Sequence, residues 1–225
     1  LLFRPLRIIA DKFNVLQMGM IAGERVFKVL DNEDVAKNNH KHQSIDTVQK
    51  FNGDISFKEV SFAYIEDRYV LKNISFDVPA GKTLAIVGHT GSGKTSIISL
   101  INRLYQINQG KITIDDISIE DMPLDTLRRN IAVVLQDVFL FSGSIRDNIT
   151  LHNPHIQQQQ IEEAARLIGM HEFIMQLPGQ YDYQVMERGS ALSTGQRQLL
   201  SFIRALVYDP SILILDEATS SVDTE

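Results

Sequence analysis

The chain has 225 residues, of which 44% are hydrophobic and 22% are charged, and its formal net charge is -6. This length accommodates one α/β domain with an appendage, and the apolar fraction indicates a folded core rather than a disordered chain. The negative charge argues against a general affinity for nucleic acid, and the lack of cysteine excludes disulfides and thiolate metal sites. No run approaches the roughly 20 apolar residues that cross a bilayer.

The first segment is predicted to form one long amphipathic helix, from about Arg4 to Leu30. At about 1.5 Å per residue this helix is roughly 40 Å long, too long to bury an apolar seam on itself. We therefore expect it to pack on partner helices, the alternative being a helix that packs on its own domain. The apolar residues recur in steps of three and four and so share one narrow face: Leu6, Ile9, Phe13, Leu16, Met20, Gly23, Phe27 and Leu30.

Residues 31–50 are polar and show no hydrophobic period, so they are predicted to form a linker. A folded domain starts near Phe51. Alternation with period two predicts half-buried strands, whereas the continuous apolar run Leu84–Val87 predicts a strand covered on both faces. The alternating segments are Ile55–Phe57, Val60–Tyr64 and Ile74–Val78, and the helix expected after Leu84–Val87 has Ile97, Ile98, Ile101 and Leu104 on its buried side.

The second half of the chain is predicted to be an α/β structure with an inserted helical block. The stretch from Pro154 to Leu177 is predicted to be helical, with Asn153 as its cap, a break at Gly169 and the glutamines 157–160 on its exposed surface. The other elements expected here are a short strand pair around Ile112–Ile114, a strand at Ile131–Leu135, a helix at Thr194–Val207 and a last strand at Ile212–Leu215.

The segment Gly88–Thr95 fits the pattern G-x-x-x-x-G-K-[ST] at every fixed position, between a predicted strand and a predicted helix. In that context successive backbone N–H groups cradle phosphate oxygens at the positive end of the helix. Lys94 is then placed at the β- and γ-phosphates, and the Thr95 hydroxyl at Mg²⁺. The alternative, a chance glycine-rich turn, is disfavoured by the flanking strand and helix.

Two adjacent carboxylates, Asp216 and Glu217, directly follow the predicted strand Ile212–Leu215. Beside a phosphate loop, this arrangement predicts that Asp216 supports the magnesium and that Glu217 acts as the general base for the attacking water. Taken alone, the pair is equally typical of an ordinary helix N-terminus. The two motifs together indicate a P-loop ATPase or GTPase.

One further segment, Leu192-Ser193-Thr194-Gly195-Gln196, narrows the choice to one family. It resembles the ABC ATPase signature L-S-G-G-Q, with Thr194 in place of the first glycine. The resemblance implies that Ser193, Gly195 and Gln196 lie at a helix N-terminus and bind the γ-phosphate of an ATP held by a second copy. Without that context, Ser193 is a plain helix cap.

Other segments extend the resemblance over nearly the whole chain. Gln136 matches the family's glutamine-loop residue at the magnesium and the attacking water, and Tyr64 matches the aromatic residue that stacks on adenine. Read without the family, Tyr64 is sheet core and Gln136 a solvated loop residue. Ser220–Asp223 resembles the segment S-A-L-D at the dimer contact, and Val185–Gly189 resembles the exporter motif T-E-V-G-E-R-G, with Tyr183-Gln184 in place of Thr-Glu.

The resemblance implies an α/β fold: a P-loop NTPase core with an antiparallel β subdomain and an inserted helical subdomain, preceded by the long amphipathic helix. The expected domains are 1–30 (cytosolic extension of the last transmembrane helix), 31–50 (linker) and 51–225 (ABC ATPase). ATP and Mg²⁺ are the expected ligands. The residues implied are Lys94, Gln136 and Glu217 in catalysis, Thr95, Gln136 and Asp216 at the metal, and Tyr64, Gly88, Thr90, Gly91, Ser92, Gly93, Lys94, Thr95, Ser96, Ser193, Gly195 and Gln196 at the nucleotide.

The resemblance is to the bacterial multidrug and lipid exporters. It implies a second ABC ATPase domain and a transmembrane domain of the same polypeptide as partners, at the cytoplasmic face of the membrane, with no nucleic acid. The family also has a histidine after the S-A-L-D segment, whereas all six histidines here precede Asp216. We therefore expect a C-terminally truncated domain that hydrolyses ATP poorly by itself.

Three classes of protein other than an exporter ATPase have the same nucleotide-binding motifs. A DNA-repair or chromosome-structure ATPase of the same superfamily requires a long coiled-coil insertion between phosphate loop and signature, which the sequence lacks. A soluble translation-factor ATPase carries two such domains in one chain. A regulatory module that does not hydrolyse ATP gains no support from an intact Glu217.

Overall fold

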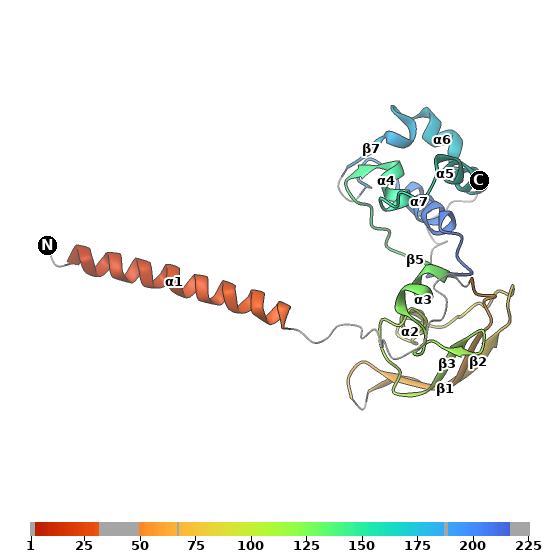
Figure 1. Ribbon diagram of the computed structural model, residues 1–225, viewed down its shortest axis with the longest axis horizontal. Helices are drawn as coiled ribbons and strands as arrows, with labels where there is room; N and C mark the ends of the chain where they lie inside the picture. The colour runs from red at the N-terminus through yellow and green to blue at the C-terminus, as the bar shows by residue number, and fades with distance from the viewer. Residues whose placement is uncertain (1–2, 32–49, 67, 187–188, 217–225) are drawn as a thin grey trace. The chain divides into compact units, whose positions relative to one another are not determined.

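The computed structural model describes residues 3–31, 50–66, 68–186 and 189–216. By its contacts the chain divides into two compact units, Leu1–Lys37 and Asn38–Glu225. The first unit contains α1 (Phe3–Leu30), an unbroken helix of 28 residues with no buried side chain (Figure 1). The prediction of a long helix from Arg4 to Leu30 is confirmed. Within the described ranges, no helix is both long enough and apolar enough to cross a membrane.

The second unit starts with a four-stranded antiparallel sheet in the order β2-β1-β3-β4 (Figure 1). One face of β1 contributes its apolar side chains to the first hydrophobic core, together with the buried face of the helix α2. The expected segments Ile55–Phe57 and Val60–Tyr64 form one strand, except that the strand ends at Ala63, one residue before Tyr64. The bounds are β1 Ile55–Ala63, β2 Tyr69–Val78, β3 Gln109–Ile114, β4 Ile117–Ser118 and α2 Lys94–Ile101.

β1 contains one residue more than its partner across a short stretch. Lys58 pairs with Lys111, but Ser61 pairs with Gln109, so three steps in β1 oppose two steps in β3. Glu59 within this β-bulge has a left-handed backbone (φ 52°). The facing residue is Gly110, where an added Cβ would lie 2.4 Å from the Glu59 carbonyl oxygen. Only glycine permits this close approach.

A parallel strand pair follows, formed by β5 and β8 in register from Ile131 opposite Ile212 to Val134 opposite Leu215. The next backbone N–H, that of Asp216, donates to the carbonyl oxygen of Val134 at 2.9 Å. The carboxyl ends of both strands therefore meet at one edge, where α/β folds bind their ligands. The bounds are α3 Leu124–Asn130, β5 Ile131–Val134 and β8 Ile212–Leu215.

The inserted helical subdomain has a hydrophobic core of its own, centred on α7. Ile145, Ile149, Ile174 and Ile203 are fully buried in it. Helices α4 to α7 gather around it in Figure 1. The bounds are β6 Gly143–Ser144, α4 Ile145–Thr150, α5 Gln158–Leu167, α6 His171–Gln176, the short 3₁₀ helix η1 Gln180–Asp182, β7 Gln184–Val185 and α7 Thr194–Val207.

Two sequence predictions in the first core are wrong. The run Leu84–Val87 is not part of a strand, and Val87 is 89% exposed. Leu84 and Ile86 line a cavity of about 310 Å³ together with β8 residues instead of pairing with that strand, so the run lacks the sheet neighbours that cover a buried strand. Leu104 is 59% exposed rather than buried, because α2 ends at Ile101 and Leu104 lies beyond its periodic face.

The helical stretch predicted between Pro154 and Leu177 begins later than expected and is divided. α5 starts at Gln158, and its cap is Gln157 rather than Asn153. The Gln160 N–H donates to the Gln157 carbonyl oxygen at 3.1 Å, and the Gln160 side chain accepts the Gln157 backbone N–H at 2.8 Å. This reciprocal cap is a use of glutamine that the usual Ser, Thr, Asp and Asn preference does not predict. The break at Gly169 is confirmed, with a left-handed φ of 77°.

Candidate functional site

The phosphate loop is shaped by its glycines. Gly91 and Gly93 have left-handed backbones with φ of 85° and 95°, and α2 begins directly after Gly93. A Cβ on Gly93 would lie 2.6 Å from Leu71, and one on Gly88 would lie 2.6 Å from the Ser92 hydroxyl. The first turn of a helix leaves backbone N–H groups without intrahelical acceptors and carries positive partial charge. The loop therefore presents a tight, electropositive backbone turn, which suits phosphate.

Lys94, Thr95 and Asp216 come together at this loop. The Lys94 ammonium lies across the loop and donates to the Gly88 carbonyl oxygen at 2.8 Å, with the His89 carbonyl oxygen at 3.3 Å. The Thr95 hydroxyl and the Asp216 carboxylate are 3.5 Å apart, although 121 positions separate them in the sequence. A hydroxyl and a carboxylate beside a phosphate site form the oxygen donor set that Mg²⁺ prefers. The residues present fit a magnesium–nucleotide complex.

Tyr64 lies next to this turn. Its hydroxyl is 3.0 Å from the hydroxyl of Ser96, a buried residue in the first turn of α2. The Tyr64 side chain is 48% exposed, so part of its ring remains accessible for stacking. The structure thus brings two of the predicted nucleotide-binding residues into direct contact. Thr90 and Ser92 are exposed and lie in the turn between Gly88 and α2.

Gln136 follows β5 and is exposed, two positions beyond the Val134 carbonyl that receives the Asp216 N–H. The segment around it is held by α7. Gln198 is 2% exposed and directs its amide toward the Leu135 carbonyl oxygen at 3.4 Å. Arg204 donates to the carbonyl oxygens of Asn148 at 2.8 Å and of Phe139 at 3.3 Å. Burial lowers the pKa of Arg204.

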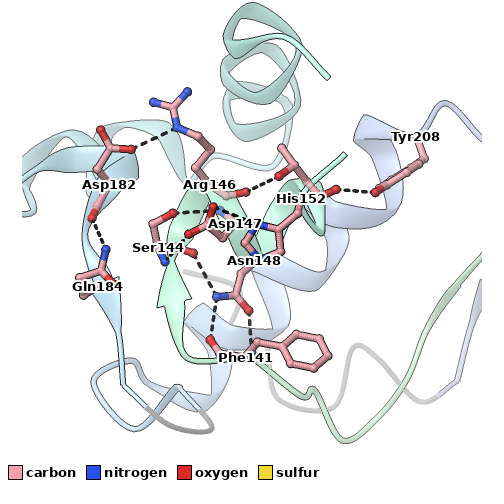
Figure 2. Close-up of polar contacts among 10 residues, drawn as sticks. Phe141, Ser144, Arg146, Asp147, Asn148, His152, Asp182, Gln184 and Tyr208 are labelled. Atoms are coloured by element: carbon pink, nitrogen blue, oxygen red, sulfur yellow. Dashed lines mark hydrogen bonds and ion pairs between the residues drawn. The ribbon is translucent and has the colours of Figure 1, made fainter. Parts of the chain in front are cut away.

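The segment that follows Gln136 is ordered by a polar network, which Figure 2 shows. The Asn148 side chain accepts the Phe141 N–H at 2.8 Å and donates to the Phe141 carbonyl at 2.9 Å, which closes the turn before α4. Ser144 caps α4 through a reciprocal pair of hydrogen bonds with Asp147. Tyr208, which directly follows α7, donates to the Thr150 carbonyl oxygen at 2.6 Å. Side chains from two helices therefore fix the backbone of this segment.

The signature residues occupy the first turn of α7, as expected. The Ser193 hydroxyl accepts the Gln196 N–H at 3.1 Å, and the Gln196 side chain accepts the Ser193 N–H at 2.9 Å. Ser193 is thus a helix cap, and Gly195 lies in the turn that it caps. This helix end belongs to the helical subdomain, because Leu192 and Leu200 are buried in the second core.

Several predicted residues lie outside the described part of the chain. They are Glu217, the segment Ser220–Asp223 and residues 187–188 of the segment that resembles the exporter motif.

Sequence reasoning missed the side chains of α7 that hold the glutamine segment. Gln198 and Arg204 were included only as part of a predicted helix. A signal was present, since Gln198 falls among apolar residues on the buried side of α7, and a buried polar side chain requires a partner. The partner itself, the Leu135 carbonyl oxygen 63 positions away, was not predictable from spacing.

Comparison with known proteins places these features in a family. Residues 71–220 match the family model described as ABC transporter. The chain is 49% identical over 223 residues to the uncharacterized ABC transporter ATP-binding protein YknV of Bacillus subtilis, covering 99% of this chain and 36% of that protein. It is 42% identical over 226 residues to an ATP-dependent lipid A-core flippase of Vibrio parahaemolyticus, covering 100% of this chain and 38% of the flippase.

A solved structure agrees with these relatives. The structure of a bacterial Atm1-family ABC exporter with ATP bound matches with a TM-score of 0.84 and 33% identity, over 99% of this chain and 38% of that chain. The chain thus spans somewhat more than a third of the length of these relatives. Their transporter identity removes the grounds for the DNA-repair and translation-factor alternatives. The chain belongs to the ABC transporter family and carries its ATP-binding domain, of the exporter type.

Proposed function

We propose that the chain binds MgATP between two copies of this domain and hydrolyses it to drive export across a membrane. The observation that carries the proposal is the convergence of Lys94, Thr95 and Asp216 on the glycine turn before α2. The transporter, flippase and exporter relatives, which match over 99% or more of the chain, support the transport function.

In this proposal the chain's own residues bind and orient the reactants. Lys94 and the N-terminus of α2 hold the β- and γ-phosphates, and Tyr64 stacks on the base. Thr95 and Asp216, with Gln136, hold Mg²⁺, which when bound neutralises charge on the phosphates. Glu217 orients the attacking water and accepts its proton. Catalysis then rests on positioning and on electrostatic stabilisation.

The proposed partner is a second ATPase domain, arranged head to tail. Ser193 and Gly195 at the N-terminus of α7 are suited to bind a phosphate, because the helix end carries positive partial charge. The γ-phosphate that they reach belongs to the nucleotide of the other copy. ATP then stabilises the closed dimer through its differential affinity, and hydrolysis releases it.

The proposed second partner is a transmembrane domain of the same polypeptide, with the ATPase unit at the cytoplasmic face. Residues 1–30 are proposed to extend its last membrane helix, 31–50 to be a linker, and 51–225 to be the ATPase domain. A hollow of about 450 Å³ next to the glutamine segment is lined by α3, by Asp137–Phe139, by Arg204 of α7 and by Tyr208 directly after that helix. Phe139 in its lining and Phe141 in edge-to-face contact with Phe139 are 54% and 56% exposed, and we propose that this apolar surface contacts the transmembrane domain.

The first prediction tests nucleotide binding. Lys94→Ala should weaken the affinity of the chain for MgATP at least about tenfold, since charge-assisted hydrogen bonds contribute roughly 1.5–3 kcal/mol. Isothermal titration calorimetry measures this affinity. Lys72→Ala, which removes the same charge from an exposed position of β2, is the matched control and should bind normally. Unchanged affinity in Lys94→Ala would overturn the proposed function.

A further inference from the structure

A second tyrosine, Tyr105, packs against Tyr64. The centroids of the two rings are 5.0 Å apart and their planes are at 90°, an edge-to-face contact. Phe62 completes a cluster of three rings, at 4.7 Å from Tyr64 and 5.7 Å from Tyr105. Phe62 is buried, whereas both tyrosines are 48% exposed. The accessible part of the Tyr64 ring therefore has a second accessible aromatic ring beside it.

The segment that carries Tyr105 is fastened to the end of β1. The Leu104 N–H donates to the Ser99 carbonyl oxygen of α2 at 2.9 Å. On the other side of Tyr105, the Asn108 N–H donates to the Ser61 carbonyl oxygen at 3.1 Å, and the Asn108 side chain accepts the Ala63 N–H at 2.8 Å. Ala63 directly precedes Tyr64. Hydrogen bonds at residues flanking the two tyrosines thus hold their segments together and keep the two rings in contact.

Three contacts define the orientation of the Tyr64 ring. Its hydroxyl is held at Ser96 in the first turn of α2, which fixes the far end of the ring. A hydroxyl contact alone leaves the ring free to rotate about its long axis. The edge-to-face contacts with Tyr105 and Phe62 restrict that rotation, because turning the Tyr64 ring would lose this favourable geometry with both neighbours. Phe62 acts from the core and Tyr105 from the exposed side.

We propose that Tyr105 is a positioning residue for base recognition: it sets the plane of the Tyr64 ring and so raises the affinity for the nucleotide base. The inference rests on the proposed function, in which Tyr64 stacks on the base. Stacking requires a defined ring plane, since its energy depends on parallel overlap. Tyr105 acts through its ring, so phenylalanine is expected to replace it and an aliphatic side chain is not.

The experiment compares ligands with and without a base on the 225-residue chain. Calorimetry measures the affinities for MgATP and for magnesium tripolyphosphate, which occupies only the phosphate loop. Tyr105→Leu should weaken MgATP binding about two- to tenfold and leave tripolyphosphate binding unchanged. Tyr105→Phe should match the unchanged chain with both ligands. Leu104→Ala, in the same exposed segment but without an aromatic ring, is the control for a loosened backbone.

The outcomes separate this inference from the proposed function. Equal loss for both ligands, or a loss for Tyr105→Phe as large as for Tyr105→Leu, would show a general structural role and overturn the inference. Unchanged MgATP affinity in Tyr105→Leu overturns it too. Tyr64→Leu tests the proposed function itself, because a normal MgATP affinity in that variant contradicts base stacking by Tyr64. Tyr105→Met serves as a second aliphatic replacement if the leucine variant does not fold.

Discussion

At the scale of single residues, Asp147 illustrates how one carboxylate orders the segment after the glutamine loop. Its side chain accepts the Ser144 N–H at 3.0 Å, and its own N–H donates to the Ser144 hydroxyl at 3.0 Å (Figure 2). Hydrogen bonding of the carboxylate with the Ser144 side chain and with the Ser144 backbone N–H, together with attraction by His152 and Arg146, holds the pKa of Asp147 below its ordinary value. The carboxylate also lies in the first turn of α4, where negative charge is favourable.

The lowered pKa of Asp147 makes the stability of the chain depend on pH. A carboxylate whose pKa is lowered by folding contributes stability above its unfolded pKa, and this contribution is lost as the pH falls through the folded value. The stability of the chain should therefore decline below about pH 4, and Asp147→Asn should reduce that decline. Urea denaturation between pH 7 and pH 3 measures it.

The matched control for this pH dependence is Asp116→Asn, which neutralises an exposed carboxylate in the turn between β3 and β4. It should retain the full decline of the unchanged chain. An identical pH profile for Asp147→Asn and Asp116→Asn contradicts the role assigned to Asp147.

At the scale of elements, α7 links the signature to the glutamine segment. The helix carries the signature residues in its first turn and directs Gln198 and Arg204 at the backbone before and after Gln136. These contacts join β5, α4 and α7 through side-chain-to-backbone hydrogen bonds. A displacement of the segment that holds Phe139 therefore acts on the same helix that positions Ser193.

Replacing Arg204 with methionine tests this link. The change keeps much of the apolar stem and removes the hydrogen bonds to the Asn148 and Phe139 carbonyl oxygens. We expect a loss of roughly 1.5–3 kcal/mol in the free energy of unfolding, the range for hydrogen bonds to charged groups. Urea denaturation measures it. Arg166→Met, which breaks the i,i+4 pair with Glu162 on α5, should cost no more than about 0.5 kcal/mol; equal losses in both variants would refute the special role of Arg204.

The secondary-structure elements differ in how well the sequence predicts them. The bounds of α7 and β8 follow from apolar periodicity and length, and both agree with the structure. Leu84–Val87 has the composition of a buried strand, but composition does not specify which neighbours pair with it, and here none does within the described residues. The glycine motif is a local pattern and predicted Lys94 and Thr95 at one turn. The contact of Tyr64 with Ser96 joins distant segments, so it depends on tertiary packing that a local pattern does not specify.

At the scale of the whole molecule, the proposed site is divided between two copies. The phosphate loop belongs to the first core and the signature turn to the second. A variant defective in one half should therefore be complemented by a variant defective in the other half. This holds only if each nucleotide is enclosed by both copies.

Co-expression experiments test this arrangement in the proposed full-length transporter, which joins this domain to a transmembrane domain. Glu217→Gln should retain ATP by blocking hydrolysis, and in that background Lys94→Ala and Ser193→Arg should each abolish retention. When the two double variants are co-expressed, they should retain about a quarter of the ATP that Glu217→Gln alone retains. Random pairing makes half of the dimers mixed, and each mixed dimer has one intact site of its two. Rapid gel filtration with labelled ATP measures retention. No recovery would indicate that both halves of the site come from one copy.

The irregularity in β1 has a consequence for the side of the sheet on which the site forms. Side chains of one parity share a face of a strand. Before Glu59 the odd positions Ile55 and Phe57 enter the core, and after it the even positions Val60 and Phe62 do. Tyr64, the residue after β1 and two positions beyond Phe62, contacts the Phe62 ring and has its hydroxyl 3.0 Å from that of Ser96, in line with this phase. In a strand of uniform phase, the ring that we assign to the base would stand on the opposite face, away from the phosphate turn.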